Sequence, residues 1–379
     1  MFDGLSLVID KSTLQSLSSD ESFWLGMFFH VILTPTLFME IRADLLKASQ
    51  SGRQPEQEVA ILADKISGGS ATISPDYHFL CRHNLMEDSV EMRGRPILLG
   101  GKEFVAEDGR RGLFFDEQPP IKSLRKWRDG IFTDEDWEHA QAWRDELSKI
   151  DLDWVKKELA WTRAHTKNIK TDADVLAMVD QSLGTHSQSF ETLNNIMGLL
   201  RISTVMHARI IEKWERAGKP MVGIYAPYAT HVARIDMFFY SALARGLLDT
   251  NKPSDRVDLT YLYYLPFAKV FASSDNFHKR LTPLFLSGGR TFIEGDDLKA
   301  DLVAIRDFHE TLPEDKKSMN LPPLEGDFLV SRLYDQYRPG WRERAKEPPI
   351  EITPERNEKI MERLRPMMEA IDDLKKGEA

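Results

Sequence analysis

Four acidic residues have types and positions suited to chemistry, because each lies within a few residues of a short apolar segment. These four acids are Asp10, Glu40, Asp258 and Asp275. Clustered carboxylates repel one another unless protons or cations lie between them, and hard cations such as Mg²⁺ and Mn²⁺ prefer oxygen ligands. A cation held in this way can activate a water and stabilise the charge that builds on a phosphoryl oxygen. If the fold brings the four acids together, they predict a divalent metal site that hydrolyses a phosphodiester.

The residues before Asp10 and Glu40 predict two short strands. The apolar run over residues 5–9 ends at Asp10, and a second apolar run covers residues 31–33. A threonine-proline pair follows the second run and favours a helix start, because threonine caps the first turn and proline lacks an N–H that this position does not need. The resulting helix, over residues 35–47, places Glu40 in its second turn.

The residues around Asp258 and Asp275 continue this pattern. Asp258 opens an apolar segment of helical type over residues 259–265, and residues 269–272 predict a strand that ends shortly before Asp275. Strands and helices that alternate in this way predict a parallel α/β sheet, whose ligand crevice lies beyond the carboxyl ends of its strands. We therefore expect the four acids to face one crevice.

The chain divides into three predicted parts. Residues 1–48 and 200–312 form the core of an α/β domain with a central parallel sheet flanked by helices. Residues 49–199 form a mostly helical insertion. Residues 313–379 form a C-terminal extension, whose last helix, over residues 353–376, either docks on the body or packs on a partner subunit in a homodimer.

Smaller features complete this interpretation. An apolar run at residues 96–99 suggests a further strand, and residues 221–225 suggest either a strand or a buried run. Helical spacing covers residues 203–214 and 231–247. The insertion also contains five tryptophans: Trp127, Trp137, Trp143, Trp154 and Trp161. Aromatic side chains can stack on unpaired bases, but large aromatics in helical segments are more often part of a core, and we expect a core here.

The composition excludes several classes of protein. With 379 residues, of which 42% are hydrophobic and 29% charged, the chain is long enough for one large globular domain or two modest ones. It has neither a run of roughly 18 apolar residues nor a secretory signal, so we expect a cytoplasmic protein without membrane contact. A single cysteine, Cys81, fits a reducing compartment. The formal charge of −10 argues against binding nucleic acid by a basic surface alone.

Three stretches of the sequence resemble the acidic signature of PIN domains, a family of ribonucleases that includes toxins and RNA-processing enzymes. They are Val8-Ile9-Asp10-Lys11-Ser12, residues 34–41, and the stretch from Asp258 to Ser273-Ser274-Asp275. The spacings agree, with 30 residues from the first acid to the second and 17 from the third to the fourth. The similarity covers residues 1–48 and 220–295. The long segment before the third acid and the Asn-Phe-His that follows the fourth differ from the pattern of compact PIN domains.

The resemblance implies a PIN-like fold and a metal-dependent endoribonuclease. The four acids would hold Mg²⁺ or Mn²⁺, with Ser12 or Thr13, and Ser274, as secondary polar groups near the metal or the phosphate. RNA would be the substrate, and an inhibitor protein of the antitoxin kind is a partner that the resemblance leaves open.

Basic residues near the four acids are candidates for binding the phosphate backbone. Arg256 and Lys279 lie nearest in sequence to the third and fourth acids, and we predict both as substrate contacts. Further basic residues flank the acidic elements at Arg234, Arg280 and Arg290. Solvated surface charge is the ordinary alternative for most of them.

Other residues offer alternative ligands. Asp236 and Asp255 could add to the four acids or replace one of them, but Asp236 lies mid-helix and Asp255 follows a turn, so both rank lower. His78, Cys81 and His83 lack a convincing fourth ligand for a soft metal, which favours a structural or surface role. Taken singly, each of the four acids also fits a role as a helix cap, a turn residue or a solvated residue.

Two rival functions stay open at this stage. One is a catalytically silent PIN-like scaffold that binds RNA or directs assembly through the insertion; retention of the four acids argues against it. The other is a different α/β hydrolase or a pure interaction protein, which would be favoured if the four acids lay more than one ligand shell apart.

Overall fold

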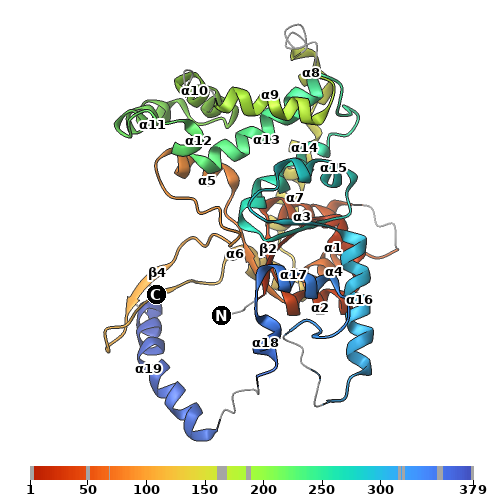
Figure 1. The fold of residues 1–379 in the computed structure, drawn as a ribbon, viewed down its shortest axis with the longest axis vertical. Helices are drawn as coiled ribbons and strands as arrows, with labels where there is room; N and C mark the ends of the chain where they lie inside the picture. The colour runs from red at the N-terminus through yellow and green to blue at the C-terminus, as the bar shows by residue number, and fades with distance from the viewer. Residues whose placement is uncertain are drawn as a thin grey trace.

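The fold is an α/β architecture in which helices flank a parallel sheet, as the sequence predicts (Figure 1). The computed structural model describes residues 4–47, 52–67, 69–159, 169–184, 189–314, 317, 321–347 and 353–376. The strands of its five-stranded sheet are β1 (Leu5–Ile9), β2 (Phe29–Leu33), β3 (Ser70–Ile73), β6 (Val270–Ser273) and β7 (Thr291–Glu294). The predicted strands that lead to Asp10 and Asp275 are therefore confirmed.

The strand order places a topological switch point beside β1. The order is β3-β2-β1-β6-β7 and every pairing is parallel, with Leu7 opposite Val31 on one side and Val270 on the other. The chain thus leaves β1 toward one edge of the sheet and later returns to build the other edge. In open α/β sheets, ligands bind outside the carboxyl ends of the strands at such a point.

Helices on the sheet explain why its central strands are apolar throughout. All five residues of β1 are buried, as expected for a parallel strand that is covered on both faces. The flanking helices are α1 (Lys11–Ser16), α2 (Ser19–Phe28), α3 (Pro35–Ala43), α4 (Pro55–Ser67), α15 (Asn276–Phe285) and α16 (Gly295–Thr311). A short 3₁₀ turn, η1 (Asp44–Leu46), extends α3 and completes the predicted helix over residues 35–47.

The sheet includes part of the predicted insertion. Strand β3 pairs with β2 along its whole length, and α4 packs on α2, η1 and β3. Helix α6 (Pro119–Arg128) packs on α4, and α7 (Asp134–Ser148) packs on α3. The core predicted for residues 1–48 and 200–312 therefore lacks an edge strand and several covering helices. Sequence patterns missed β3 because its four residues are only partly buried and include Ser70 and Thr72.

A helical layer lies beyond the sheet and occupies the top of the view in Figure 1. Its central helix is α13 (Pro227–Ala244), which contacts most of the others. The remaining members are α5 (Tyr77–Leu85), α8 (Leu152–Glu158), α9 (Asp172–Gly184), α10 (Ser189–Leu199), α11 (Thr204–Arg216) and α12 (Val222–Tyr225). Helices α11 and α13 were predicted. The strand suggested for residues 221–225 is wrong, because this segment forms α12, a single helical turn that leads into α13.

A hairpin and the last helix form an arm that reaches away from the body (Figure 1). Strands β4 (Lys102–Val105) and β5 (Arg111–Phe114) pair antiparallel, and α19 (Pro354–Lys376) packs on β4. The strand suggested for residues 96–99 is wrong, since these residues form no strand, and Leu98 and Leu99 are each 44% exposed. Two short helices, α17 (Leu329–Tyr337) and α18 (Trp341–Ala345), precede α19. None of the described helices is both long and apolar enough to cross a membrane.

The predicted tryptophan core is only partly correct. Trp127 is fully buried, Trp137 and Trp143 are partly buried, and Trp154 is 59% exposed. Trp161 lies outside the described residues. Helical periodicity cannot separate these cases, because Trp154 lies on a seven-residue helix with one buried residue.

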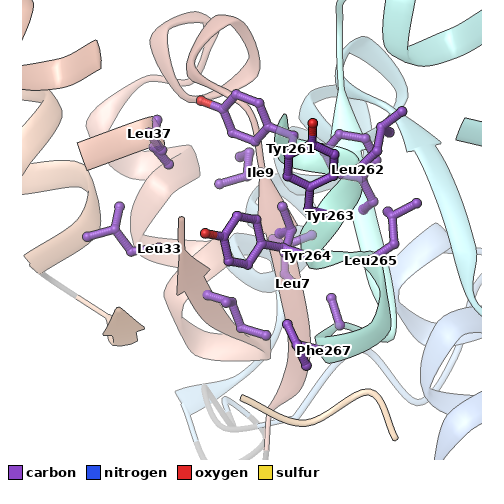
Figure 2. Packing of buried hydrophobic residues seen from close by; sticks show 14 of the residues in the cluster. Leu7, Ile9, Leu33, Leu37, Tyr261, Leu262, Tyr263, Tyr264, Leu265 and Phe267 are labelled. Atoms are coloured by element: carbon purple, nitrogen blue, oxygen red, sulfur yellow. The ribbon is translucent and has the colours of Figure 1, made fainter. Parts of the chain in front are cut away.

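The segment before β6 is a hub of aromatic packing. Helix α14 (Asp255–Asp258) runs directly into the 3₁₀ helix η4 (Leu259–Phe267), which is buried along most of its length. Figure 2 shows Tyr261, Tyr263 and Tyr264 of η4 projecting beside Leu7 and Ile9 of β1. Each of these tyrosine hydroxyls reaches a different part of the chain: Glu40, Asp236 and the carbonyl of Pro75.

Buried His231 on α13 makes part of the fold sensitive to acid. Burial lowers the pKa of His231 to about 4, from an ordinary value near 6.5. Its Nε2 donates to the Leu262 carbonyl 3.1 Å away. Between pH 6.5 and 4 the unfolded chain gains a proton at this site while the folded ring stays neutral, so its contribution lowers stability as the pH falls.

We expect this contribution to reach about 3 kcal/mol at pH 4. Carboxyls with raised pKa values act in the opposite sense, so the wild type must be compared with His231→Gln, whose amide can also donate to Leu262. Urea unfolding at pH 7.5 and pH 4.5 should show the variant gaining stability relative to the wild type on acidification. An equal pH dependence in both proteins would contradict the assignment.

Candidate functional site

The four acids line one small pocket of about 180 Å³. They come from four elements: the ends of β1, α3, α14 and the turn after β6. We call this the acid pocket; its lining residues are Asp10, Lys11, Ser12, Gln15, Glu40, Asp258, Tyr261 and Asp275. It lies beyond the carboxyl ends of β1 and β6, at the switch point of the sheet. The structure brings the four acids together in one pocket, as predicted. Metal binding by the pocket stays a prediction.

Asp10 is the most firmly held of the four. The residue is 4% exposed, and its Oδ1 accepts from the backbone N–H of Thr13 at 3.0 Å, which caps α1. Its Oδ2 accepts from Ser12 Oγ at 2.6 Å and from Ser273 Oγ at 2.9 Å. Burial raises the pKa of Asp10, but the nearby His278 ring and these hydrogen bonds outweigh it and lower the pKa overall. Asp10 therefore both caps α1 and lines the acid pocket.

Glu40 faces the pocket from α3 and meets a buried phenol. The Tyr261 hydroxyl donates to Glu40 Oε2. Burial raises the pKa of Glu40, and the negative charges of Asp10 and Asp44 add to that effect, while the Tyr261 bond and the Lys11 charge oppose it. Burial and the neighbouring acids also keep the pKa of Tyr261 well above its ordinary value, so the phenol remains a donor.

Asp258 and Asp275 complete the acidic wall. Burial raises the pKa of Asp258 to about 7, and the negative charges of Glu40, Asp275 and Asp255 contribute in the same direction. Asp275 caps α15 by accepting from the backbone N–H of Phe277 at 2.6 Å. Asp255 does not line the pocket, but burial and the charge of Asp275 raise its pKa to about 6. This pattern indicates more negative charge than the pocket can hold without protons or a cation.

His278 connects three parts of the site and was left unassigned by the sequence. Its ring is fully buried, with Nδ1 at 2.8 Å from Ser273 Oγ and Nε2 at 2.7 Å from the Asp258 carbonyl. Because a carbonyl only accepts, Nε2 carries a proton. The Ser273 hydroxyl also bonds to Asp10 and accepts from the backbone N–H of Asp275. The only sequence signal for His278 is its place three residues after Asp275, on the inner face of α15.

Of the predicted substrate contacts, Ser12 lines the acid pocket and the other three do not. Ser274 Oγ lies 3.3 Å from Thr13 Oγ1, beside a close approach at Gly295, where an added Cβ would lie 2.1 Å from Ser274 Oγ. Lys279 pairs with Glu294 at 2.7 Å on the surface.

Arg256 is the clearest correction among the predicted contacts. Its guanidinium points into the protein, where Nη1 donates to the Tyr263 hydroxyl at 3.0 Å and Nη2 lies 3.5 Å from Asp236 Oδ1. Sequence distance from Asp258 misled the prediction, because residues two apart on a helical turn face different directions.

The flanking basic residues are also engaged. Arg234 pairs with Asp180, Arg280 pairs with Asp172, and Arg290 donates to backbone carbonyls that include that of Pro266. The one basic residue among those lining the pocket is Lys11, whose Nζ lies 2.7 Å from Asp44 Oδ1. The described part of the chain therefore offers the acid pocket few free cationic side chains for phosphates.

The alternative ligands do not join the pocket. Asp236 belongs to the buried pair with Arg256. Cys81 is fully buried, and His83 bonds to Asp88 at 2.7 Å. Their structural role is therefore the better description.

The acid pocket has the donor chemistry for a hard cation but not a preassembled ligand cage. Its acidic wall supplies oxygen donors alone, and burial raises the pKa values of Glu40 and Asp258. Within the described residues, however, no three His, Cys, Asp or Glu side chains stand close enough together to hold one ion. Hydrogen bonds from Tyr261, Ser12 and Ser273 now occupy the oxygens of Glu40 and Asp10.

We compared the chain with family models, curated proteins and solved structures. No family model, curated protein or solved structure matches this chain.

Proposed function

We propose that the chain is a divalent-metal-dependent nuclease of the PIN-like kind, which hydrolyses RNA phosphodiesters as an endoribonuclease. The observation that carries the proposal is the meeting of the four acids, from four separate elements, in one pocket at the switch point of a parallel sheet. The choice of RNA comes from the sequence resemblance. The single, buried thiol of Cys81 fits work in the reducing cytoplasm.

The residues of the acid pocket have separable tasks in this proposal. Mg²⁺ or Mn²⁺ bound among the four acids would supply water activation and charge stabilisation. Asp10, fixed by three hydrogen bonds, provides the least mobile carboxylate. Tyr261 orients Glu40, and Asp258, whose pKa burial raises to about 7, completes the acidic wall, where a bound cation would keep its carboxylate ionised. Lys11 offsets part of the negative charge at the rim.

Cleavage of a mixed pool of single-stranded and hairpin RNA tests the proposal. Purified protein is incubated with Mn²⁺, Mg²⁺ or EDTA. Asp275→Asn is assayed in parallel with the control Asp116→Asn, which breaks an exposed pair with Lys102. We expect cleavage that needs metal, is lost in Asp275→Asn and is retained in Asp116→Asn. If the wild type does not bind Mn²⁺, the proposed metal site is wrong, and so is the proposed nuclease activity.

A binding scaffold is the second candidate. The lack of a preassembled three-ligand group among the described residues favours a protein that binds without cutting, whether a silent PIN-like scaffold or an interaction protein of another kind. Binding of both Mn²⁺ and RNA without cleavage would select this function over the nuclease.

Substrate binding should depend only weakly on salt, because the basic residues around the acid pocket are mostly paired. With one or two phosphate contacts to a single strand, raising KCl from 50 to 200 mM should weaken binding by about 3- to 7-fold, since each contact contributes a slope of about 0.7. Fluorescence anisotropy with Asp10→Asn protein and labelled RNA measures this. A loss of a hundredfold or more would instead reveal an extended basic surface.

A further inference from the structure

A second buried charge network lies outside the acid pocket. Asp236, on α13, is 4% exposed and accepts a hydrogen bond from the Tyr263 hydroxyl. Arg256 donates to the same hydroxyl and lies 3.5 Å from the Asp236 carboxylate. The Tyr77 ring packs on Tyr263 at 4.6 Å, and the Arg256 guanidinium lies 6.0 Å from the ring of Tyr240. We call these residues the Asp236 network.

The Asp236 network and the acid pocket share one segment of chain. Arg256 lies on α14 two residues before Asp258, and Tyr263 lies on η4 two residues after Tyr261. Within eight residues, the chain therefore contacts the helical layer at Arg256 and Tyr263 and the acid pocket at Asp258 and Tyr261. Figure 2 shows Tyr261 and Tyr263 emerging from the same stretch of η4.

Stability alone gives a weak reason for such a network. Burying a charged pair costs desolvation energy, and apolar residues of similar volume are often equally stabilising. A charged pair that shares a phenol, however, fixes the relative orientation of the segments that carry it. Hydrogen bonds require narrow angles, and a displaced partner would be left unsatisfied. Contacts of this kind can hold the α14–η4 segment in place, since α14 is only four residues long and has no side-chain cap.

We propose that Asp236 is a positioning residue for the acid pocket: through Arg256 and Tyr263 it anchors α14 and η4, and thereby Asp258 and Tyr261, to the helical layer. This inference rests on the proposed metal-dependent function of the pocket. It gives the helical layer a task, namely to set the geometry of one wall of the site. Groups that hydrogen-bond directly to metal ligands typically change metal affinity by 10- to 100-fold when removed. Asp236 acts one step further from the ligands, so we expect an effect at the lower end of that range.

The test compares Asp236→Asn and Tyr263→Phe with the matched control Asp180→Asn. Both network changes conserve volume. The control breaks a different ion pair of helix α13, the one between Arg234 and Asp180 of α9. Mn²⁺ affinity is measured by titration calorimetry on folded protein, well below its melting temperature. Amide hydrogen exchange of residues 255–263 is measured without metal.

We expect the Mn²⁺ dissociation constant to rise about 10-fold in Asp236→Asn and Tyr263→Phe, with faster exchange over residues 255–263. Asp180→Asn should change neither. If Asp236→Asn does not fold, Tyr263→Phe decides the matter, since it removes one hydroxyl and keeps the ring. A merely structural role would lower the melting temperature and leave the affinity of the folded protein unchanged.

Two failures are distinguishable. Wild-type protein that binds no Mn²⁺ overturns the proposed function, and this inference with it. Wild-type protein that binds Mn²⁺, with unchanged affinity in both network variants, overturns the role of Asp236 and leaves the proposed function standing. Equal weakening by Asp180→Asn would also overturn the inference.

Discussion

Asp10→Asn should lower metal-dependent RNA cleavage by about 1000-fold or more. The substitution removes the charge of a carboxylate that lines the acid pocket and is held by three hydrogen bonds. A bound cation contributes several kcal/mol of charge stabilisation in phosphoryl chemistry, and about 4 kcal/mol corresponds to a factor of roughly 1000 in rate. Single-turnover cleavage with saturating Mn²⁺ measures the chemical step.

The design of this variant separates charge from structure. Asparagine caps helices about as well as aspartate, so the bond from the Thr13 backbone can persist and α1 should remain intact. We expect a melting temperature within a few degrees of the wild type in EDTA. Retention of more than a tenth of the cleavage rate by folded Asp10→Asn would mean that the pocket does not hold the catalytic metal.

The ends of strands carry most of the information that sequence gives about this site. Asp10 follows a buried parallel strand that is apolar at nearly every position, and β6 likewise ends just before Asp275. Parallel strands end at the same edge of a sheet, so these two positions could be placed together without a structure. Glu40 could be added because Thr34 and Pro35 mark the start of α3.

The sequence did not reveal the side-chain contacts between segments that are far apart along the chain. Tyr261 lies in a run of apolar residues that predicts only burial, and its bond to Glu40 joins positions 221 residues apart. Arg256 was expected at the substrate because it lies near Asp258 in sequence, yet the burial of Asp236 on α13 draws it inward. No local pattern encodes which partner a buried polar group finds, since that depends on the packing of α13 against η4.

The predicted boundary of the insertion was wrong for a related reason. Strand β3 is short, half-buried and at the edge of the sheet, so its residues lack the continuous apolar run that marks β1. The polar and charged surface of α4 and α6 has the appearance of a separate helical subdomain. Their packing on one another and on the sheet assigns them to the same core.

Trp127→Ala tests whether this core is continuous, with an expected loss of about 3–5 kcal/mol in the free energy of unfolding. Trp127, on α6, is fully buried and stacks on Phe38 of α3 with ring centroids 5.0 Å apart. Glu40 lies two residues further along α3, facing the acid pocket. Truncation of the indole therefore leaves a cavity directly behind the helix that presents one of the four acids.

Trp154→Ala is the matched control, because the same residue type is 59% exposed on α8, and its loss should change stability by less than about 0.5 kcal/mol. Urea unfolding followed by both tryptophan fluorescence and circular dichroism measures the two variants. A continuous core predicts coincident transitions that shift together in Trp127→Ala. A separate early transition in that variant, with the sheet unfolding at its wild-type midpoint, would show that α6 belongs to an independent insertion after all. If the transitions stay coincident, the support behind Glu40 extends through α6, and the acid pocket depends on residues that its own sequence motifs do not include.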